Sequence, residues 1–246
     1  MSGPGAYAEV IAFTLPGMVI GLLFHELAHA GVALRLGDPT PRRRHGLSLD
    51  PRRQLDAVGV AALLVAGFGW ARPVPLNSPH LEGRVRRALV IAAGPLSHLL
   101  VAAVFAATLR IELATSGLDI DGFVTTAQTG SVQGVFTGLL LQGFFINVAL
   151  CIYSLVPLPG LDGYALLRNL VFPRASWLFL RLEQWRVLVY LVALLAVVLP
   201  AEISHGAANP LAAATVGAAS VLFSHTVVPG VTPIFLGLPN IFMAFS

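Results

Sequence analysis

The sequence contains no lysine, a single cysteine and few charged residues of either sign: 11% of its 246 residues are charged. Soluble domains carry about 25% charged residues, so this chain has too few to cover a soluble surface. Hydrophobic residues make up 56%, and the mean hydropathy is +0.80. Cys151 has no partner for a disulfide, and its apolar surroundings favour a buried structural role. Together these features favour a membrane protein.

Long apolar runs are the main feature that is present. A membrane-spanning helix needs about 20 mostly apolar residues. The chain is therefore predicted to be an all-α polytopic membrane protein with about five to six transmembrane helices. Residues 110–131 are predicted to form a loop, and 166–186 an amphipathic connection. The glycine-rich stretch 55–75 predicts a short re-entrant or β-hairpin element after the first helix. The predicted spans cover about 7–36, 87–109, 132–156, 187–199 and 211–228.

The arginines predict the orientation. Fourteen of the fifteen fall in two segments, one between the first and second spans and one between the third and fourth. The positive-inside rule makes that side cytoplasmic and leaves the N-terminus outside. The formal charge of +3 thus reflects arginines in short loops that set the membrane orientation. The lipid bilayer is the expected surrounding, and no nucleic-acid partner is expected. The expected location is a bacterial-type plasma membrane.

The first predicted span carries His25, Glu26 and His29, the pattern H-E-x-x-H. Histidines four residues apart lie on one face of a helix, so both imidazoles reach a single metal ion. The intervening glutamate is placed to take a proton from an attacking water. The alternative is a helix without a metal ion, in which the three polar side chains only pair with one another. Placing three polar groups inside the membrane would then cost free energy and serve no function.

A catalytic zinc usually has three protein ligands, and Asp162 is the best candidate for the third. It lies in a proline- and glycine-rich break after the third span, toward the same membrane side as the histidines. A carboxylate there would offset the charge of an ion held by two neutral imidazoles. The alternative is an ordinary turn residue in Leu161-Asp162-Gly163.

These motifs, in this order, resemble the site-2 protease family of intramembrane zinc metalloproteases. H-E-x-x-H matches residues 25–29, and the family motif N-x-x-P-x-P-x-L-D-G matches residues 154–163, with Ser154 in place of the asparagine. Gly94-Pro95 and the stretch 68–75 also resemble family segments. The resemblance covers roughly residues 10–175 and implies one catalytic Zn²⁺.

The resemblance implies that the protein hydrolyses peptide bonds in or near transmembrane segments. Glu26 would be the general base, and His25, His29 and Asp162 the ligands. The family asparagine is associated with positioning substrate or stabilising the oxyanion, so Ser154 and Asn147 are candidates for that role. For Asn147, the alternative is hydrogen bonding between helices. His98, after Gly94-Pro95, is expected to pack beside the site.

The implied substrates are single-span regulators, such as anti-sigma factors or membrane-held transcription factors. The whole of 1–246 is predicted to be one membrane-embedded domain, with a catalytic core at about 7–175 and C-terminal helices at about 186–246. No cleavable signal peptide is expected, because the N-terminus lacks a basic region. The main alternative is a catalytically silent scaffold of the same fold that binds membrane helices. A metallochaperone and a small transporter are less consistent with Glu26 and with the lack of repeats.

Overall fold

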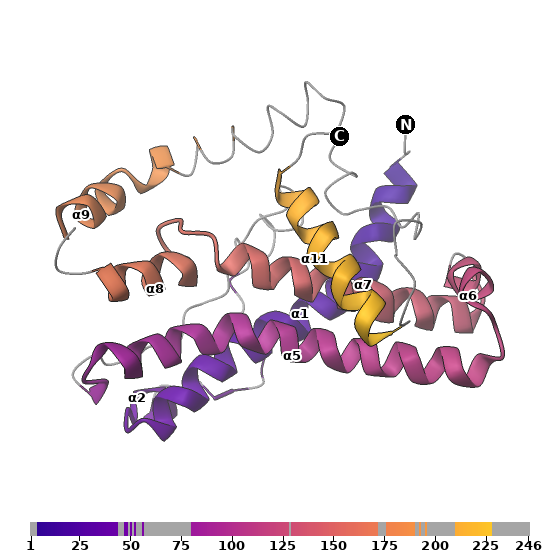
Figure 1. The fold of residues 1–246 in the computed structure, drawn as a ribbon, viewed down its shortest axis with the longest axis horizontal. Helices are drawn as coiled ribbons and strands as arrows, with labels where there is room; N and C mark the ends of the chain where they lie inside the picture. The colour runs from indigo at the N-terminus through magenta and orange to yellow at the C-terminus, as the bar shows by residue number, and fades with distance from the viewer. Residues whose placement is uncertain are drawn as a thin grey trace.

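The computed structural model describes residues 4–43, 47–48, 50, 52, 56, 80–127, 129–171, 176–189, 192, 195 and 210–227. Within these ranges the regular secondary structure is entirely helical (Figure 1). The all-α prediction is therefore confirmed for the described residues. The helices are α1 (Pro4–Arg35), α2 (Thr40–Arg43), α5 (Arg84–Ser116), α6 (Ile120–Ala127), α7 (Val132–Ser154), α8 (Asp162–Val171), α9 (Ser176–Gln184) and α11 (Pro210–Thr226).

Three of the described helices are long and apolar enough to cross a membrane: Ile11–Arg35 of α1, Arg84–Ser116 and Val132–Ser154. They correspond to the first three predicted spans. On α5, large apolar side chains are exposed at roughly helical spacing along one face, as expected for contact with lipid. These exposed residues are Leu89, Leu96, Leu100, Val104 and Ile111.

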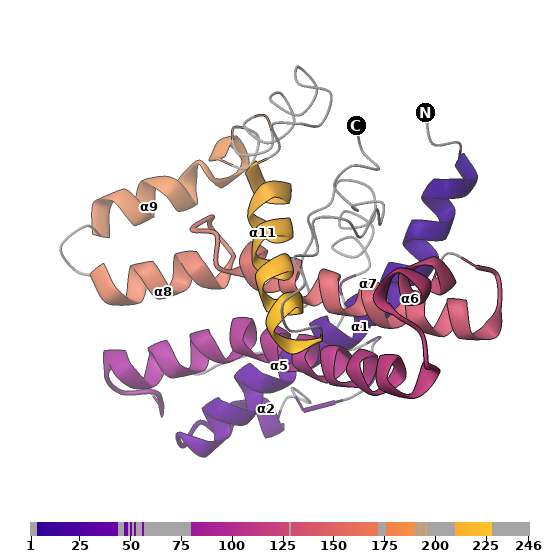
Figure 2. The same ribbon diagram turned by 45° about the vertical axis from the view of Figure 1, so that its right-hand side comes forward.

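The three long helices pack against one another, and α11 packs on α7 and α5 (Figure 2). Glycines let α1 approach α7 closely, because a β carbon on Gly17 would lie 3.3 Å from the backbone nitrogen of Gly143. Small residues at helix contacts are the usual solution in membranes, where burial from water gives no driving force. Nearer α6 and α11, the apolar cluster includes Ala106, Leu109, Phe123, Leu141, Phe144, Val148 and Phe223.

The predicted loop over 110–131 is wrong in the structure. Helix α5 continues to Ser116 and ends at Gly117, whose φ of 68° is left-handed and suits glycine. α6 then occupies 120–127. Two polar side chains near the end of α5 contact other helices. Thr137 of α7 donates a hydrogen bond to Glu112, and Arg110 donates to the carbonyl of Thr226.

Other predicted boundaries lie close to the observed ones. α7 ends at Ser154, just before the predicted break, and α8 begins at Asp162, within its last residues. The amphipathic connection is the pair α8 and α9, which lie side by side in both views (Figures 1 and 2). Within 55–75 the structure describes only Asp56, so the hairpin prediction falls outside the described residues. Most of the predicted span 187–199 also falls outside them.

Candidate metal centre

Helix α1 brings the two motif histidines together in its second half. The Nε2 atoms of His25 and His29 are 3.1 Å apart, and their rings meet edge to face with centroids 4.7 Å apart. Both side chains are largely buried, with exposed fractions of 12% and 10%. The i, i+4 spacing of a helix produces this convergence.

Asp162 reaches the same point from the start of α8. Its Oδ2 lies 3.1 Å from His25 Nε2, and its Oδ1 lies 3.4 Å from His29 Nε2. The turn before it is tight. Gly160 has a φ of 94°, and a β carbon on Gly163 would overlap the carbonyl group of Leu155. The glycines thus fold the chain back sharply enough to bring the carboxylate from the end of α7 to the histidines of α1.

The charge of Asp162 is favoured by its neighbours. Burial raises the pKa of this carboxyl, but hydrogen bonds and charge interactions with His25 and His29 outweigh burial and hold the pKa below its usual range. Asp162 is therefore ionised at neutral pH, the state that a carboxylate needs in order to bind a metal ion.

Helix α5 shapes the other side of the cluster. Nδ1 of His29 donates a hydrogen bond to the Val90 carbonyl, 2.7 Å away. That bond places the proton on Nδ1 and leaves the lone pair of Nε2 facing His25 and Asp162. Gly94 lies directly against the imidazoles, and a β carbon there would come 2.6 Å from Cε1 of His25. The glycine of Gly94-Pro95 thus provides the space that the histidine pair occupies.

The cluster fits a metal ion. The ligand atoms of His25, His29 and Asp162 all lie within 4.8 Å of one another. In a tetrahedral zinc site with bonds of about 2.0–2.1 Å, neighbouring ligand atoms are about 3.3 Å apart, close to the observed 3.1–3.4 Å. Nitrogen and oxygen atoms at this spacing can share protons, as in the hydrogen bonds given above, or can face one common cation. Among the described residues, these three form the group that could hold one.

Glu26 lies in the same turn of α1 as the two histidines. Its side chain is buried, with 6% exposed. A buried carboxylate beside a metal centre is the group expected to accept and return a proton.

Ser154 and Asn147 are both buried on α7 but differ in their contacts. Ser154, the last residue of the helix, donates through Oγ to the Cys151 carbonyl at 2.9 Å. Asn147 is fully buried, and its amide nitrogen donates to the carbonyls of Gly17 and Gly143. The polar groups of Asn147 thus link helices, which was the alternative considered from the sequence.

His98 belongs to a hydrogen-bond network whose partners could not be predicted from the sequence. Its Nδ1 donates to Asn147 Oδ1 at 3.2 Å, and its ring lies against that of His25, with centroids 4.9 Å apart. Asn147 in turn packs on α1, where a β carbon on Gly21 would overlap its side chain. Polar residues inside predicted spans were the available signal for this network. Their pairing depends on how three helices cross.

Comparisons with known proteins agree with the geometry. The chain is 35% identical over 176 residues to "Putative zinc metalloprotease YwhC" of Bacillus subtilis (strain 168), covering 71% of this chain and 76% of that protein. It is 29% identical over 198 residues to "Putative zinc metalloprotease Rip2" of Mycobacterium tuberculosis (strain ATCC 25618 / H37Rv), covering 78% and 70%. The Rip2 of Mycolicibacterium smegmatis (strain ATCC 700084 / mc(2)155) is 26% identical over the same length. No family model and no solved structure matches the chain.

Three apolar helices around a buried His-His-Asp cluster define a membrane protein with a candidate metal centre. The chain belongs to the site-2 protease family. The names of its relatives support a metalloprotease role and imply zinc as the metal. Together with the apolar helices, they indicate that the chain is integrated in a membrane.

Proposed function

We propose that the protein is an intramembrane zinc metalloendopeptidase that cuts peptide bonds in or near the transmembrane segments of membrane-anchored regulators. The observation that carries the proposal is the convergence of His25, His29 and Asp162 within 4.8 Å, with Glu26 buried in the same helical turn. A metal-storage or scaffold protein would not need that carboxylate.

In the proposed reaction, His25, His29 and Asp162 hold one Zn²⁺. When bound, the ion supplies Lewis-acid chemistry that polarises a carbonyl and makes water a nucleophile at neutral pH. Glu26 accepts the proton of the attacking water and returns it to the leaving amine nitrogen. The Ser154 hydroxyl, at the end of α7, turns from its helix carbonyl to donate to the oxyanion. Asn147 is the second candidate for that donor.

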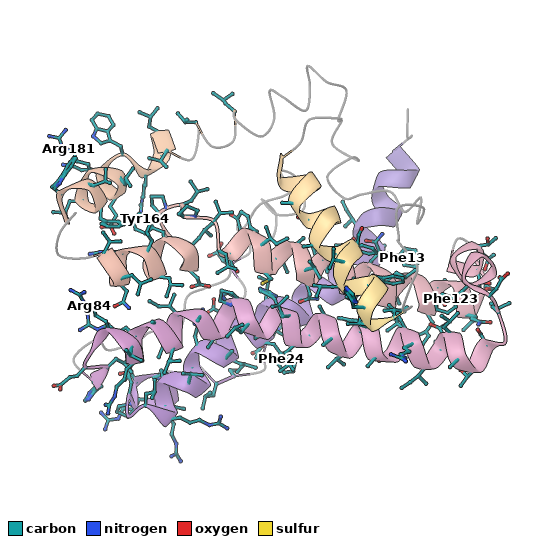
Figure 3. All side chains as sticks on the ribbon, viewed as in Figure 1. Phe13, Phe24, Arg84, Phe123, Tyr164 and Arg181 are labelled. Carbon is teal, nitrogen blue, oxygen red and sulfur yellow. The ribbon has the colours of Figure 1, made fainter. Side chains whose placement is uncertain are left out.

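We further propose that the arginine-rich end of the bundle is cytoplasmic, with the N-terminus outside. Arg84 at the start of α5 and Arg181 of α9 lie at one end of the molecule, and Phe123 of α6 lies at the other (Figure 3). The positive-inside rule favours this orientation in a bacterial-type plasma membrane. Five to six spans and an element at 55–75 that pairs with an unwound substrate complete the proposed topology. The proposed substrates are single-span proteins of the anti-sigma-factor or membrane-held transcription-factor type.

The test compares wild type with Glu26→Gln in liposomes, using a tagged single-span substrate and measuring zinc content in parallel. We expect stoichiometric zinc in both proteins and at least a 100-fold slower cleavage in the variant, about the contribution of a general base. Glu82→Gln removes an exposed carboxylate that is not part of the His25-His29-Asp162 cluster, and this variant is expected to cleave normally. Equal cleavage by Glu26→Gln would refute the assigned role. Zinc without cleavage in wild type would favour the silent scaffold.

A further inference from the structure

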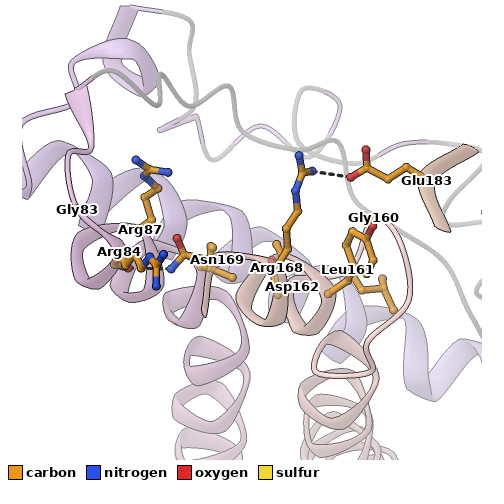
Figure 4. A pocket seen from close by; sticks show the side chains of 12 residues that line it. Gly83, Arg84, Arg87, Gly160, Leu161, Asp162, Arg168, Asn169 and Glu183 are labelled. Carbon is orange, nitrogen blue, oxygen red and sulfur yellow. Dashed lines mark hydrogen bonds and ion pairs between the residues drawn. The ribbon is translucent and has the colours of Figure 1, made fainter. Parts of the chain in front are cut away.

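The two histidines of the candidate metal centre differ in what surrounds the second nitrogen of each ring. Nδ1 of His29 is bonded to the Val90 carbonyl at 2.7 Å. Nδ1 of His25 is buried and has no hydrogen-bond partner within the part of the chain that the structure describes. A cavity of about 680 Å³ reaches Asp162, but its described lining includes neither histidine (Figure 4). The surroundings of His29 are thus complete, whereas His25 lacks a partner for Nδ1.

The ring nitrogen that faces the metal position determines where the proton of a neutral imidazole lies. Nε2 of His25 faces His29 Nε2 and Asp162 Oδ2, each 3.1 Å away. When Nε2 of His25 binds a metal ion, the proton of the ring is on Nδ1, which is then an N–H donor. Histidine ligands almost always donate this proton to an acceptor, and a buried donor without one is costly. The metal-loaded protein therefore needs an acceptor beside His25.

His98 of α5 carries such an acceptor. The amide nitrogen of Asn147 donates to the carbonyls of Gly17 and Gly143, so the amide is oriented with its Oδ1 toward His98. The proton in the bond between His98 Nδ1 and this oxygen therefore belongs to Nδ1. In the neutral ring, Nε2 of His98 then has a lone pair, and it forms no hydrogen bond within the described ranges.

The donor and the acceptor lie in rings that contact each other. The ring centroids of His25 and His98 are 4.9 Å apart, and the ring planes are inclined by 39°. Two imidazoles joined by an N–H···N bond have centroids roughly 5 Å apart, because an N···N distance of about 2.9 Å adds to the two ring radii. His98 is 1% exposed, so its ring is enclosed by protein. A change in ring tilt, without movement of the helices, therefore brings the two nitrogens together.

We propose that His98 is a positioning residue of the metal centre, and that its Nε2 accepts a hydrogen bond from Nδ1 of His25 when the metal is bound. The bond completes a chain from His25 through His98 and Asn147 to the carbonyls of Gly17 on α1 and Gly143 on α7. The proposal rests on the proposed function, because it requires the metal site. Such outer partners orient a histidine ligand, and their loss usually lowers metal affinity by about 10- to 100-fold.

Two substitutions separate this role from a purely structural one. An asparagine side chain places its amide near the position of histidine Nδ1, whereas glutamine reaches the position of Nε2. His98→Asn should therefore keep the bond to Asn147 and lose the acceptor for His25, and His98→Gln should do the reverse. We expect zinc affinity to fall about tenfold or more in His98→Asn and at most about threefold in His98→Gln. A residue that only ties α5 to α7 would give the opposite order.

Zinc affinity is measured on the full chain in detergent micelles with a competing chelator, and thermal unfolding reports whether each variant is folded. The absorption spectrum of the cobalt-loaded protein should change in His98→Asn and resemble wild type in His98→Gln, because it reports the arrangement of the ligands. Thr137→Val is the matched control. It removes another buried hydrogen bond of α7, to Glu112, and neither residue is part of the metal cluster. An equal loss of zinc affinity in Thr137→Val would mean a general packing effect and would overturn the proposal.

Further outcomes separate this proposal from the proposed function. Equal zinc affinity in wild type and both His98 variants overturns the positioning role and leaves the metalloprotease proposal standing. X-ray absorption of zinc-loaded wild type should show two imidazole ligands, and three would make His98 a ligand and the proposal wrong. Wild type that binds no zinc overturns both proposals. The expected order of affinities in a protein that cleaves no peptide would contradict the protease function and support the role of His98.

Discussion

Gly94 of α5 lies directly against the imidazole of His29, and a β carbon on Gly94 would overlap that ring. Gly94→Ala should therefore displace the histidine pair and lower zinc affinity at least about tenfold, as expected when the surroundings of a ligand are disturbed. Zinc titration with a competing chelator measures the change. Gly31→Ala is the control, because nothing lies within 4 Å of a β carbon there. It should leave affinity unchanged.

When the pH is lowered, zinc should be released because the histidine ligands take up protons, and not because Asp162 does. Histidine contacts hold the pKa of Asp162 below its usual range, so this carboxylate stays ionised as the pH falls to 4. Histidine as a residue type titrates near pH 6.5, and protons compete with the metal for the ring nitrogens. We expect half of the zinc to leave above about pH 5. Retention of zinc down to pH 4 would contradict this order.

Ser154 offers a test of the oxyanion assignment. Ser154→Ala should lower kcat about tenfold or more with zinc content unchanged, because one donor is removed. Ser154→Asn, which restores the family residue, should keep or raise kcat. Single-turnover cleavage at saturating substrate separates these effects from binding. A Ser154→Ala enzyme with full kcat would shift the assignment to Asn147.

Asn147→Leu should mainly lower the free energy of unfolding. The substitution leaves the buried carbonyl of Gly17 and the ring of His98 without their hydrogen bonds, which costs about 1–3 kcal/mol of folding free energy for each buried group. Reversible unfolding in mixed micelles measures the loss. Gln133→Leu, at an exposed position of the same helix, is the matched control. Full stability with lost kcat would instead indicate an oxyanion donor.

The candidate metal ligands could be predicted from the sequence, whereas the groups that contact them could not. The i, i+4 spacing of the histidines is a local pattern and alone predicts that their rings meet. The prediction for Asp162 rested instead on the membrane side that the arginines indicate and on the motif resemblance. The Val90 carbonyl could not be predicted, because every residue has one. The His98–Asn147 contact joins residues 49 apart in the sequence and depends on the helix crossing. The loop prediction for 110–131 failed because Glu112 is stabilised by a partner on another helix.

The positions of the proposed ligands also have a consequence for biosynthesis. His29 belongs to the first helix, whereas Asp162 follows the third long helix, and 133 residues separate them. At about 5–20 residues per second, the ribosome needs roughly 7–27 s to make that interval. During this time the nascent chain carries H-E-x-x-H without a complete set of ligands. On the proposed function, the growing chain thus stays inactive toward neighbouring membrane proteins until the ribosome has passed α7 and made Asp162 at the start of α8.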